Sequence, residues 1–501
     1  MRRFKLETST ALLSAATLFS LASGAQASED SLLNFSGFTS KNPQAALKVI
    51  LNESALKSFL SKPGSSIELK KEIKNHGFRT IKTQAYLNGL EIIGAQAFHH
   101  STPAGSFVSN QIPSFDLETK PTLSRAEAEA IARGVTIGKT NLVGRASLKI
   151  LPSEENGSAR LSYWVKVENQ GVMDRDDVVI DAHTGELIFK SSRHISIAPV
   201  HVLSATPQCQ KLDSSGDLMD IDPALCPPMI RNGQPLRHAD DSALRAASNS
   251  NKVLNYFKSR HGRDSFDGRG SALVSIVHVG RDFVNAFWSP DLKVMGYGDG
   301  DGVEFKDFTF GVDVAGHEMT HGVVSSTADL LGFGQAGALN EAISDFFGKM
   351  IAQDGHWVLG RDLFIDQNRP DAGLRDMENP RSLMTGDFKV AADGTRVPIP
   401  YPAHWNERFT TAPGEACRDD LNDSCWVHIN ATIPGHAFYR MVQAIGEARA
   451  EKIVYISLTQ FLSPRSKFID QRNAAVQVCR NLFDAGTCSK VAKAWDDVGV
   501  M

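Results

Sequence analysis

Two histidines four residues apart, His317 and His321, enclose a glutamate, Glu318, in the segment G-H-E-M-T-H-G. On a helix, positions i and i+4 share one face, so both imidazoles can reach a single ion. Glu318 is turned by about 100° from His317, towards the place where a bound water would sit. This H-E-x-x-H spacing is typical of two zinc ligands and a general base. The alternative interpretation is an amphipathic helix that carries surface histidines.

Two carboxylates follow in the segment N-E-A-I-S-D. Glu341 comes twenty residues after His321, which leaves room for a turn and the start of a second helix. It would complete a His2Glu site, the open catalytic type that keeps one position for water. Asp345 lies one helical turn after Glu341, where it can accept a hydrogen bond from a ligand imidazole and fix its tautomer. Ligands, base and supporting carboxylate together favour a zinc site over a purely structural helix.

Both segments closely resemble motifs of the thermolysin family of zinc metallopeptidases, whose helix pair carries H-E-x-x-H and N-E-x-x-S-D. The resemblance is continuous from about Ser248 to Val500 and is weakest over 205–247. It implies an α+β fold with a two-lobed catalytic domain, in which a β-rich N-terminal lobe is followed by a helical C-terminal lobe. The helix with His317 would form the floor of the cleft between the lobes. Asn340, beside Glu341, is expected to support the ligands together with Asp345.

The resemblance also implies the other catalytic residues. His428 would donate a hydrogen bond to the tetrahedral intermediate, Asp423 would orient that imidazole, and Arg375 would bind the carbonyl on the leaving-group side. A donor already placed where charge develops is typically worth ~3–4 kcal/mol. One position departs from the family: Gly332 stands where relatives have a tyrosine that donates a second hydrogen bond. We therefore expect His428 to carry more of this stabilisation, unless the loop brings in a substitute donor.

Substrate binding is likewise inferred from matching residues. Asn285 and Ala286, in V-N-A-F-W, match an edge strand whose free N–H and C=O groups hold an extended peptide. Apolar residues that match the family's pocket would line a slot for the residue after the scissile bond: Phe305, Phe308, Val314, Leu359 and Leu374. The resemblance thus implies an endopeptidase that cuts before Leu, Phe, Ile or Val.

The N-terminal part of the chain has features of export and processing. Residues 1–27 combine a basic start, an apolar run and an A-Q-A cleavage site, which is typical of a signal peptide. Asn88-Gly89 predicts a hairpin, and Ser124 with Glu127 predicts a capped helix over 124–134. The segment V-V-I-D-A-H-T-G-E-L-I is similar to the PepSY module, and the part before it resembles the fungalysin–thermolysin propeptide module. His99, His100 and His183 are interpreted as ordinary surface, strand or turn histidines.

These observations predict an ordered series of domains. In relatives such modules chaperone folding and block the active site, so we expect a removable pro-region with a processing zone over 190–208; an independent binding domain is the alternative. The expected divisions are a signal peptide (1–27), a fungalysin/thermolysin-type module (28–115), a PepSY-like module (116–195), the catalytic N-terminal lobe with the zinc-binding helix (196–327) and the helical C-terminal lobe (328–501).

Composition narrows the class of protein further. The chain has 501 residues with a formal net charge of −4, so no basic excess argues for a nucleic-acid partner. No apolar segment is long enough to span a bilayer, so we expect the mature chain to be exported and soluble. We also expect it to be a monomer. Six cysteines in an exported chain favour disulfides, although six allow fifteen connectivities. Sequence neighbours suggest the pairs Cys209–Cys226, Cys417–Cys425 and Cys479–Cys488.

Calcium is the second metal that the resemblance raises. Relatives hold a double calcium site beside the active helix, and calcium requires six to eight oxygen ligands. Asp313 is retained and Asp354 is nearby, but other residues stand at or near the expected acidic positions: Ala352, His356, Val358 and Arg361. We predict that the double site is absent. A different, single calcium site built from Asp362, Asp366 and Asp371 stays possible.

The sequence therefore predicts a secreted zinc endopeptidase made as an inactive preproenzyme, with protein or peptide substrates and its own pro-region as partners. One alternative is another His2Glu zinc enzyme such as an aminopeptidase, but no motif offers an acidic anchor for a substrate amine. The other is a secreted binding protein with a degenerate protease domain, which only Gly332 supports.

Overall fold

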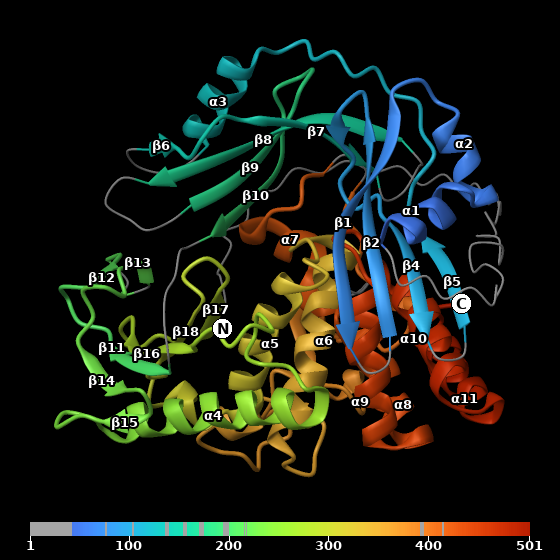
Figure 1. Cartoon of the computed structure of the whole chain (residues 1–501). Helices are drawn as coiled ribbons and strands as arrows, with labels where there is room; N and C mark the ends of the chain where they lie inside the picture. Colours follow the sequence, from blue (N-terminus) through green and yellow to red (C-terminus); the bar gives the residue numbers. More distant parts are fainter. Residues whose placement is uncertain are drawn as a thin grey trace.

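The structure is a computed structural model that describes residues 43–75, 78–102, 105–135, 140–153, 158–169, 175–193, 200–214, 216, 218–390, 395–412 and 415–501. The predicted signal peptide, residues 1–27, and part of the predicted processing zone, residues 194–199, lie outside these ranges. The chain has the α+β composition that the sequence predicts, with sheets in its N-terminal part and helices in its C-terminal part (Figure 1).

The first folded unit packs short helices against an antiparallel sheet of strand order β1-β2-β4-β5, with β3 paired to β2. Asn88 (φ 50°) and Gly89 (φ 75°) form the turn between β2 and β3, which confirms the predicted hairpin. Its elements are α1 (Pro43–Leu51), α2 (Lys57–Leu60), β1 (Ser65–Asn75), β2 (Phe78–Leu87), β3 (Leu90–Glu91), β4 (Ala97–Thr102) and β5 (Gly105–Asn110).

The second unit places one helix against a sheet of strand order β10-β9-β8-β6, with β7 paired to β8. Ser124 and Glu127 form the capping box that the sequence predicts, so the helix begins where it was expected. Its elements are α3 (Arg125–Gly134), β6 (Thr140–Leu142), β7 (Ser147–Pro152), β8 (Ala159–Asn169), β9 (Arg175–Asp181) and β10 (Leu187–Arg193).

The third sheet has the strand order β15-β14-β11-β16-β18-β17, and α4 (Asp241–His261) packs against it. β17 (Ala286–Ser289) pairs only with β18 and ends the sheet, as the sequence predicts. The other strands of this region are β11 (His201–Ser204), β12 (Gln210–Leu212), β13 (Leu218–Ile221), β14 (Pro228–Arg231), β15 (Gln234–Pro235), β16 (Val274–Val279) and β18 (Val294–Gly298).

The C-terminal part is helical apart from the short pairs β19 (Val358–Leu359) with β20 (Arg375–Asp376) and β21 (Met384–Val390) with β22 (Arg396–Pro400). Gly446 (φ 83°) ends one helix of this part and separates it from the next. The helices are α5 (Val312–Ser326), α6 (Gly334–Ala352), α7 (Asp419–Asn430), α8 (Thr432–Ile445), α9 (Glu447–Ile456), a π-helical turn (Ser457–Phe461), α10 (Phe468–Leu482) and α11 (Ala485–Asp496).

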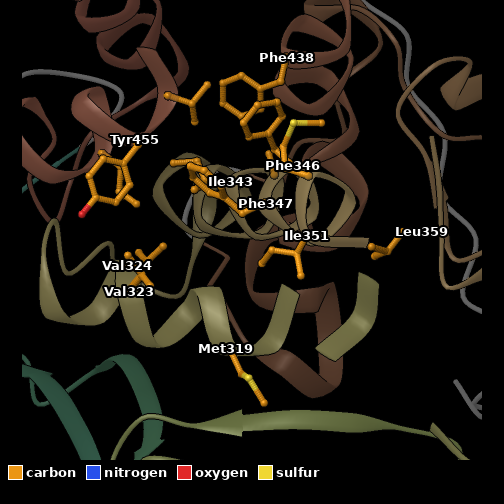
Figure 2. Packing of buried hydrophobic residues seen from close by; sticks show 14 of the residues in the cluster. Met319, Val323, Val324, Ile343, Phe346, Phe347, Ile351, Leu359, Phe438 and Tyr455 are labelled. Carbon is orange, nitrogen blue, oxygen red and sulfur yellow. The ribbon is translucent and has the colours of Figure 1, made fainter. Parts of the chain in front are cut away.

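Helices α5 and α6 lie in very close contact because glycines face each other. A Cβ atom at Gly348 would lie 2.4 Å from the carbonyl oxygen of Asp313, and one at Gly316 would lie 3.1 Å from the Cα atom of Gly348. Aromatic and aliphatic side chains of α6 then join this pair to the C-terminal helices, as Phe346 does with Phe438 of α8 at 5.3 Å between ring centroids (Figure 2).

The first unit packs against the C-terminal helices (Figure 1). His100 of β4 is fully buried and its ring stacks on Phe461 at 4.1 Å, so it is a strand residue but not a surface one. Thr80 donates to Oε1 of Gln460 (2.6 Å), and Nζ of Lys82 donates to the carbonyl oxygen of Leu462 (3.2 Å). The turn 457–461 therefore docks on the face of β2 and β4.

All six cysteines lie within the described residues and are paired as Cys209–Cys226, Cys417–Cys425 and Cys479–Cys488. The neighbour pairing suggested by the sequence is confirmed. Within the described part of the chain, no helix has both the length and the apolar character that crossing a membrane requires.

His278, at the end of β16, bridges two acidic side chains. Its Nδ1 atom lies 2.9 Å from Asp299, and its Nε2 atom lies 2.9 Å from Asp240, which also caps α4. The hydrogen bond with Asp299 and the negative charge of both carboxylates raise the pKa of His278 from 6.5 to about 9, although burial opposes the shift.

A raised pKa in the folded state means that His278 contributes its full stability below pH 6.5, and that this contribution is lost as the pH rises through about 9. We expect the free energy of unfolding of the full-length chain to fall between pH 6 and pH 10 by about 1 kcal/mol more than that of a His278→Gln variant. Urea unfolding at both pH values measures it. Equal declines in the two proteins would contradict this role for the bridge.

Candidate active site

Three side chains from α5 and α6 bring metal-ligand atoms together. Nε2 of His317 lies 3.0 Å from Nε2 of His321, and each lies 3.4 Å from a carboxylate oxygen of Glu341. Two ligand atoms about 2.0–2.1 Å from a tetrahedral zinc ion would be separated by about 3.3 Å. The donor set and its spacing therefore fit zinc, and the group is the metal-ligand cluster found among the described residues.

Asp345 holds the first ligand and is itself held by an arginine. Its Oδ1 atom lies 2.7 Å from Nδ1 of His317, and Nε and Nη2 of Arg375 donate to its two oxygens at 2.7 Å each. Burial disfavours the charge of Asp345, but Arg375 and then His317 together outweigh this effect and lower the pKa of Asp345 to about 2. A permanently ionised Asp345 leaves Nε2 of His317 free to bind metal.

The second ligand is positioned by polar residues of α6. Nδ1 of His321 lies 3.0 Å from Oδ1 of Asn340 and 3.1 Å from Oγ of Ser344. An imidazole that donates through Nδ1 presents its Nε2 lone pair to the metal. Asn340 is thus found where the sequence predicts it, whereas Ser344 was missed, although it stands inside the same N-E-A-I-S-D segment.

The expected general base lies beside the edge strand. Oε2 of Glu318 accepts a hydrogen bond from the backbone N–H of Trp288 in β17 (2.9 Å). Asn285 is exposed just before this strand, and its Oδ1 atom accepts from the N–H of Ala286 (2.9 Å). A peptide extended along the free edge of β17 would therefore run close to Glu318.

A third histidine, His428, approaches the cluster from α7. Nε2 of His428 lies 3.5 Å from Oε2 of Glu341, and its Nδ1–H donates to Oδ1 of Asp423 (2.5 Å). Burial lowers the pKa of His428, but the charges of Glu341 and Asp423 outweigh it and raise that pKa to about 9. An imidazole that stays protonated at neutral pH is suited to donate to a developing negative charge.

Gly332, the position without the family's tyrosine, is exposed in the loop between α5 and α6. A Cβ atom there would meet no other atom within 4 Å, so the loop leaves room for a side chain. The neighbouring Phe333 contacts Phe189 of β10 at 4.7 Å between ring centroids.

The residues of the predicted apolar pocket fall into two groups. Leu374 and Val314 approach each other across Gly360, and the N–H of Leu374 donates to the carbonyl oxygen of Leu359 (2.8 Å). Phe305 lies 6.1 Å from Phe308 and 4.6 Å from Phe364 between ring centroids, which adds Phe364 to the residues that the sequence indicated. All of these side chains belong to the main hydrophobic core or pack against it.

A buried lysine, Lys349, lies beside Asp313, the acidic residue that the resemblance relates to a calcium site. The side chain of Lys349 is 1% exposed, and its Nζ atom donates to Asp313 (3.2 Å), Asp354 (2.5 Å) and the carbonyl oxygen of Val358 (3.1 Å). Oδ2 of Asp313 also accepts from the N–H of Gly360 (2.9 Å). The ammonium group of Lys349 thus supplies positive charge to the carboxylate of Asp313.

The fold and this site define a zinc-dependent hydrolase: two close helices present two histidines, a glutamate ligand and an adjacent base at the edge of a sheet. Family comparison agrees with this class. The family model described as "Thermolysin metallopeptidase, catalytic domain" matches residues 231–325. The model described as "Thermolysin metallopeptidase, alpha-helical domain" matches residues 328–500.

Individual relatives cover more of the chain. Bacillolysin of Brevibacillus brevis is 30% identical over 462 residues, which are 84% of this chain and 82% of that protein. The extracellular elastase of Staphylococcus epidermidis is 31% identical over 360 residues, 68% of this chain and 64% of that protein. Among solved structures, the precursor of protealysin, a metalloproteinase from Serratia proteamaculans, aligns with a TM-score of 0.50 and 28% identity over 61% of this chain and 88% of that one. The chain belongs to the thermolysin family of metallopeptidases.

Replacement of Asp345 by Asn tests the support of the first ligand. The change removes the charge that fixes His317, so we expect zinc affinity to fall by about 10–100-fold. Competition with a chromophoric chelator measures it. The matched control is Asp376→Asn, a buried carboxylate in β20 that accepts hydrogen bonds from Glu378, Asn379 and Ser382 but touches no ligand. Equal zinc affinities of the two variants would contradict the role of Asp345.

Proposed function

We propose that this chain is the inactive precursor of a secreted zinc endopeptidase that cuts peptide bonds before bulky hydrophobic residues. The observation that carries the proposal is the triangle of donor atoms from His317, His321 and Glu341. Glu318 follows His317 in the same helix and accepts a hydrogen bond from the edge strand β17. The family membership supports the reaction class, and the remaining parts of the proposal rest on individual residues.

When bound by these ligands, zinc would polarise the substrate carbonyl and lower the pKa of the attacking water. Glu318 would take the proton of that water and pass it to the leaving amine. Its hydrogen bond from Trp288 orients one carboxylate oxygen, which leaves the other available for the proton. Because the base and the edge strand are in contact, binding of the peptide and activation of the water would occur in one place.

His428 would donate to the oxygen that becomes negative, with Asp423 holding the ring in the required tautomer. Arg375 is the expected ligand of the carbonyl on the leaving-group side. Nε and Nη2 of Arg375 already donate hydrogen bonds to Asp345, so Arg375 would contact the substrate through its remaining N–H groups. Without a tyrosine at Gly332, we expect the stabilisation to depend more on His428.

Asn285 and Ala286 at the start of β17 would hold the backbone of an extended peptide. Val314, Leu359 and Leu374 converge around Gly360, which supports an apolar slot for the residue after the scissile bond. An apolar slot of this kind discriminates by about 1–3 kcal/mol per methylene, which is enough for a preference but not for strict specificity.

The N-terminal units are proposed to be the inhibitory pro-region. This proposal is supported by a hydrophobic cluster that joins the second unit to the segment leading to Glu341. The cluster contains Val179 and Phe189 of the second unit, and Leu331, Phe333 and Ala336 of that segment. The proposed boundaries are a signal peptide (1–27), the two pro-modules (28–115 and 116–195) and the two catalytic lobes (196–327 and 328–501). β10 ends at Arg193 in the second sheet and β11 begins at His201 in the third, which supports cleavage within 190–208.

A secreted binding protein with a degenerate protease domain is the second candidate. The observation that favours it is Gly332, which cannot donate the hydrogen bond that relatives provide there. Against it stand the complete ligand triangle and the positioned Glu318. Hydrolysis of casein by the mature protein separates the two candidates.

Glu318→Ala tests the mechanism and the processing together. The variant keeps all three ligands but lacks the base, so we expect normal zinc content and a loss of hydrolysis of at least about 100-fold. If processing is autocatalytic, the uncut precursor should accumulate. Glu304→Ala, which removes an exposed glutamate that pairs with Arg369, is the control and should be processed normally. Turnover near that of the wild type in Glu318→Ala would rule out the proposed base.

The second metal can be tested by thermal unfolding. Because Lys349 already neutralises Asp313, we propose that the family's double calcium site is absent and that a bound calcium ion contributes little. A site filled at a hundred times its dissociation constant would add ~2.7 kcal/mol. We therefore expect the melting temperature of the zinc-loaded protein to change by less than about 2 °C in millimolar calcium. A rise of about 10 °C would show that acids such as Asp362, Asp366 and Asp371 build a calcium site.

Lys349→Met tests the ion pair itself. This variant leaves the buried carboxylate of Asp313 without its ammonium partner and should lower the free energy of unfolding by about 3–5 kcal/mol. Lys258→Met is the control, because Lys258 is exposed and pairs only at the surface with Asp264. Equal melting temperatures of these two variants would contradict the structural role of Lys349.

A further inference from the structure

The chain turns with left-handed helical geometry just before His428. Asp423, Ser424, Cys425 and Trp426 have φ angles of 48°, 49°, 69° and 64°, with ψ between 40° and 48°. None of the four is glycine, and this conformation costs an L-residue roughly 1–2 kcal/mol. Such a run persists only where the surrounding structure determines it.

A disulfide and a buried amide close the turn on the segment that precedes it. Cys425, the third residue of the turn, is bonded to Cys417. Asn422 is 2% exposed, and its Oδ1 atom accepts from the N–H groups of Arg418 (3.0 Å) and Cys425 (3.0 Å). The N–H of Ser424 donates to the carbonyl oxygen of Arg418 (3.1 Å). Both the covalent bond and the hydrogen bonds thus tie the turn to residues 417–418.

The turn decides where Asp423 and His428 meet. Asp423 is its first residue, and its carboxylate accepts from both the Nδ1–H (2.5 Å) and the backbone N–H (2.8 Å) of His428. If residues 423–426 relaxed to right-handed geometry, the direction of the chain between the carboxylate and the imidazole would change. Asp423 could not then keep its hydrogen bonds with both the imidazole and the backbone N–H of His428 while Nε2 of His428 stays 3.5 Å from Glu341.

We propose that the Cys417–Cys425 disulfide is a positioning element for catalysis, which holds a glycine-free left-handed turn so that Asp423 keeps His428 aimed at the reacting centre. The inference rests on the proposed role of His428. It assigns to this disulfide a function that the other two do not have, because neither of them closes on a residue beside a catalytic side chain.

The test compares kcat and KM of two double variants that both lack the Cys417–Cys425 disulfide. Cys417→Ser/Cys425→Ser should lower kcat by about 10–100-fold, because a displacement of about 1 Å has effects of this size, and should leave KM within about twofold. Cys417→Ser/Cys425→Gly also lacks the disulfide, but glycine adopts positive φ without steric cost. It should therefore recover kcat to within about fivefold of the wild type. Rescue by glycine would not follow from a general loss of stability.

The control is Cys479→Ser/Cys488→Ser, which opens a loop of similar length, with a separation of 9 residues against 8. It should lower the melting temperature and leave kcat unchanged. His428→Ala separates the two hypotheses. Nearly normal turnover in that variant would overturn the role of His428 itself. A strong loss in His428→Ala with full activity in Cys417→Ser/Cys425→Ser would overturn the role of the disulfide alone.

Should the serine variant fail to fold, graded reduction of the wild-type enzyme gives the same decision. Peptide mapping identifies which disulfide has opened at each step, and kcat is measured in parallel. A fall in kcat that follows the opening of Cys417–Cys425 supports the proposal. A fall that follows either of the other pairs contradicts it.

Discussion

The approach of α5 to α6 through Gly316 and Gly348 determines the position of the ligand atoms. Neither helix carries the site alone, because His317 and His321 come from α5 and Glu341 comes from α6. A single methyl group at Gly348 would meet the carbonyl oxygen of Asp313 and push the helices apart. Since zinc requires its ligands within a few tenths of an ångström, the site depends on residues that have no side chain.

The buried face of α6 shows how the chain accommodates this much charge in its interior. Glu341, Asp345 and Lys349 are four residues apart, so they form one stripe along the helix. Each of these three charged side chains has a partner. The ligand histidines lie beside Glu341, Arg375 pairs with Asp345, and Asp313 pairs with Lys349. A buried charge without such a partner would cost several kcal/mol. The stripe therefore combines metal binding, support of a ligand and structural pairing on a single surface.

The sequence predicted His317 and His321 because helix geometry sets their spacing, and it suggested the disulfide pairs because the partners are close in the chain. Glu341 was placed by its segment N-E-A-I-S-D, and the edge strand was inferred from the family resemblance. It could not predict contacts that depend on distant segments. Lys349 reads as an ordinary helix residue until the loop with Asp354 and Val358 folds back on it. His100 reads as a strand residue, and only packing brings Phe461 onto its ring. The left-handed turn was missed for a different reason, since D-S-C-W contains no glycine to signal positive φ.

The contacts of the first folded unit with the turn 457–461 join residues that are 380 positions apart, as Thr80 and Gln460 are. Synthesis proceeds at about 5–20 residues per second, so the last strand of this unit is complete roughly 17–70 s before the turn 457–461 exists. Until then, the strands β1, β2, β4 and β5 lack the aromatic ring of Phe461 that covers His100 in the folded chain. The turn 457–461 is made long after the strands that it covers, so this contact can form only late in synthesis.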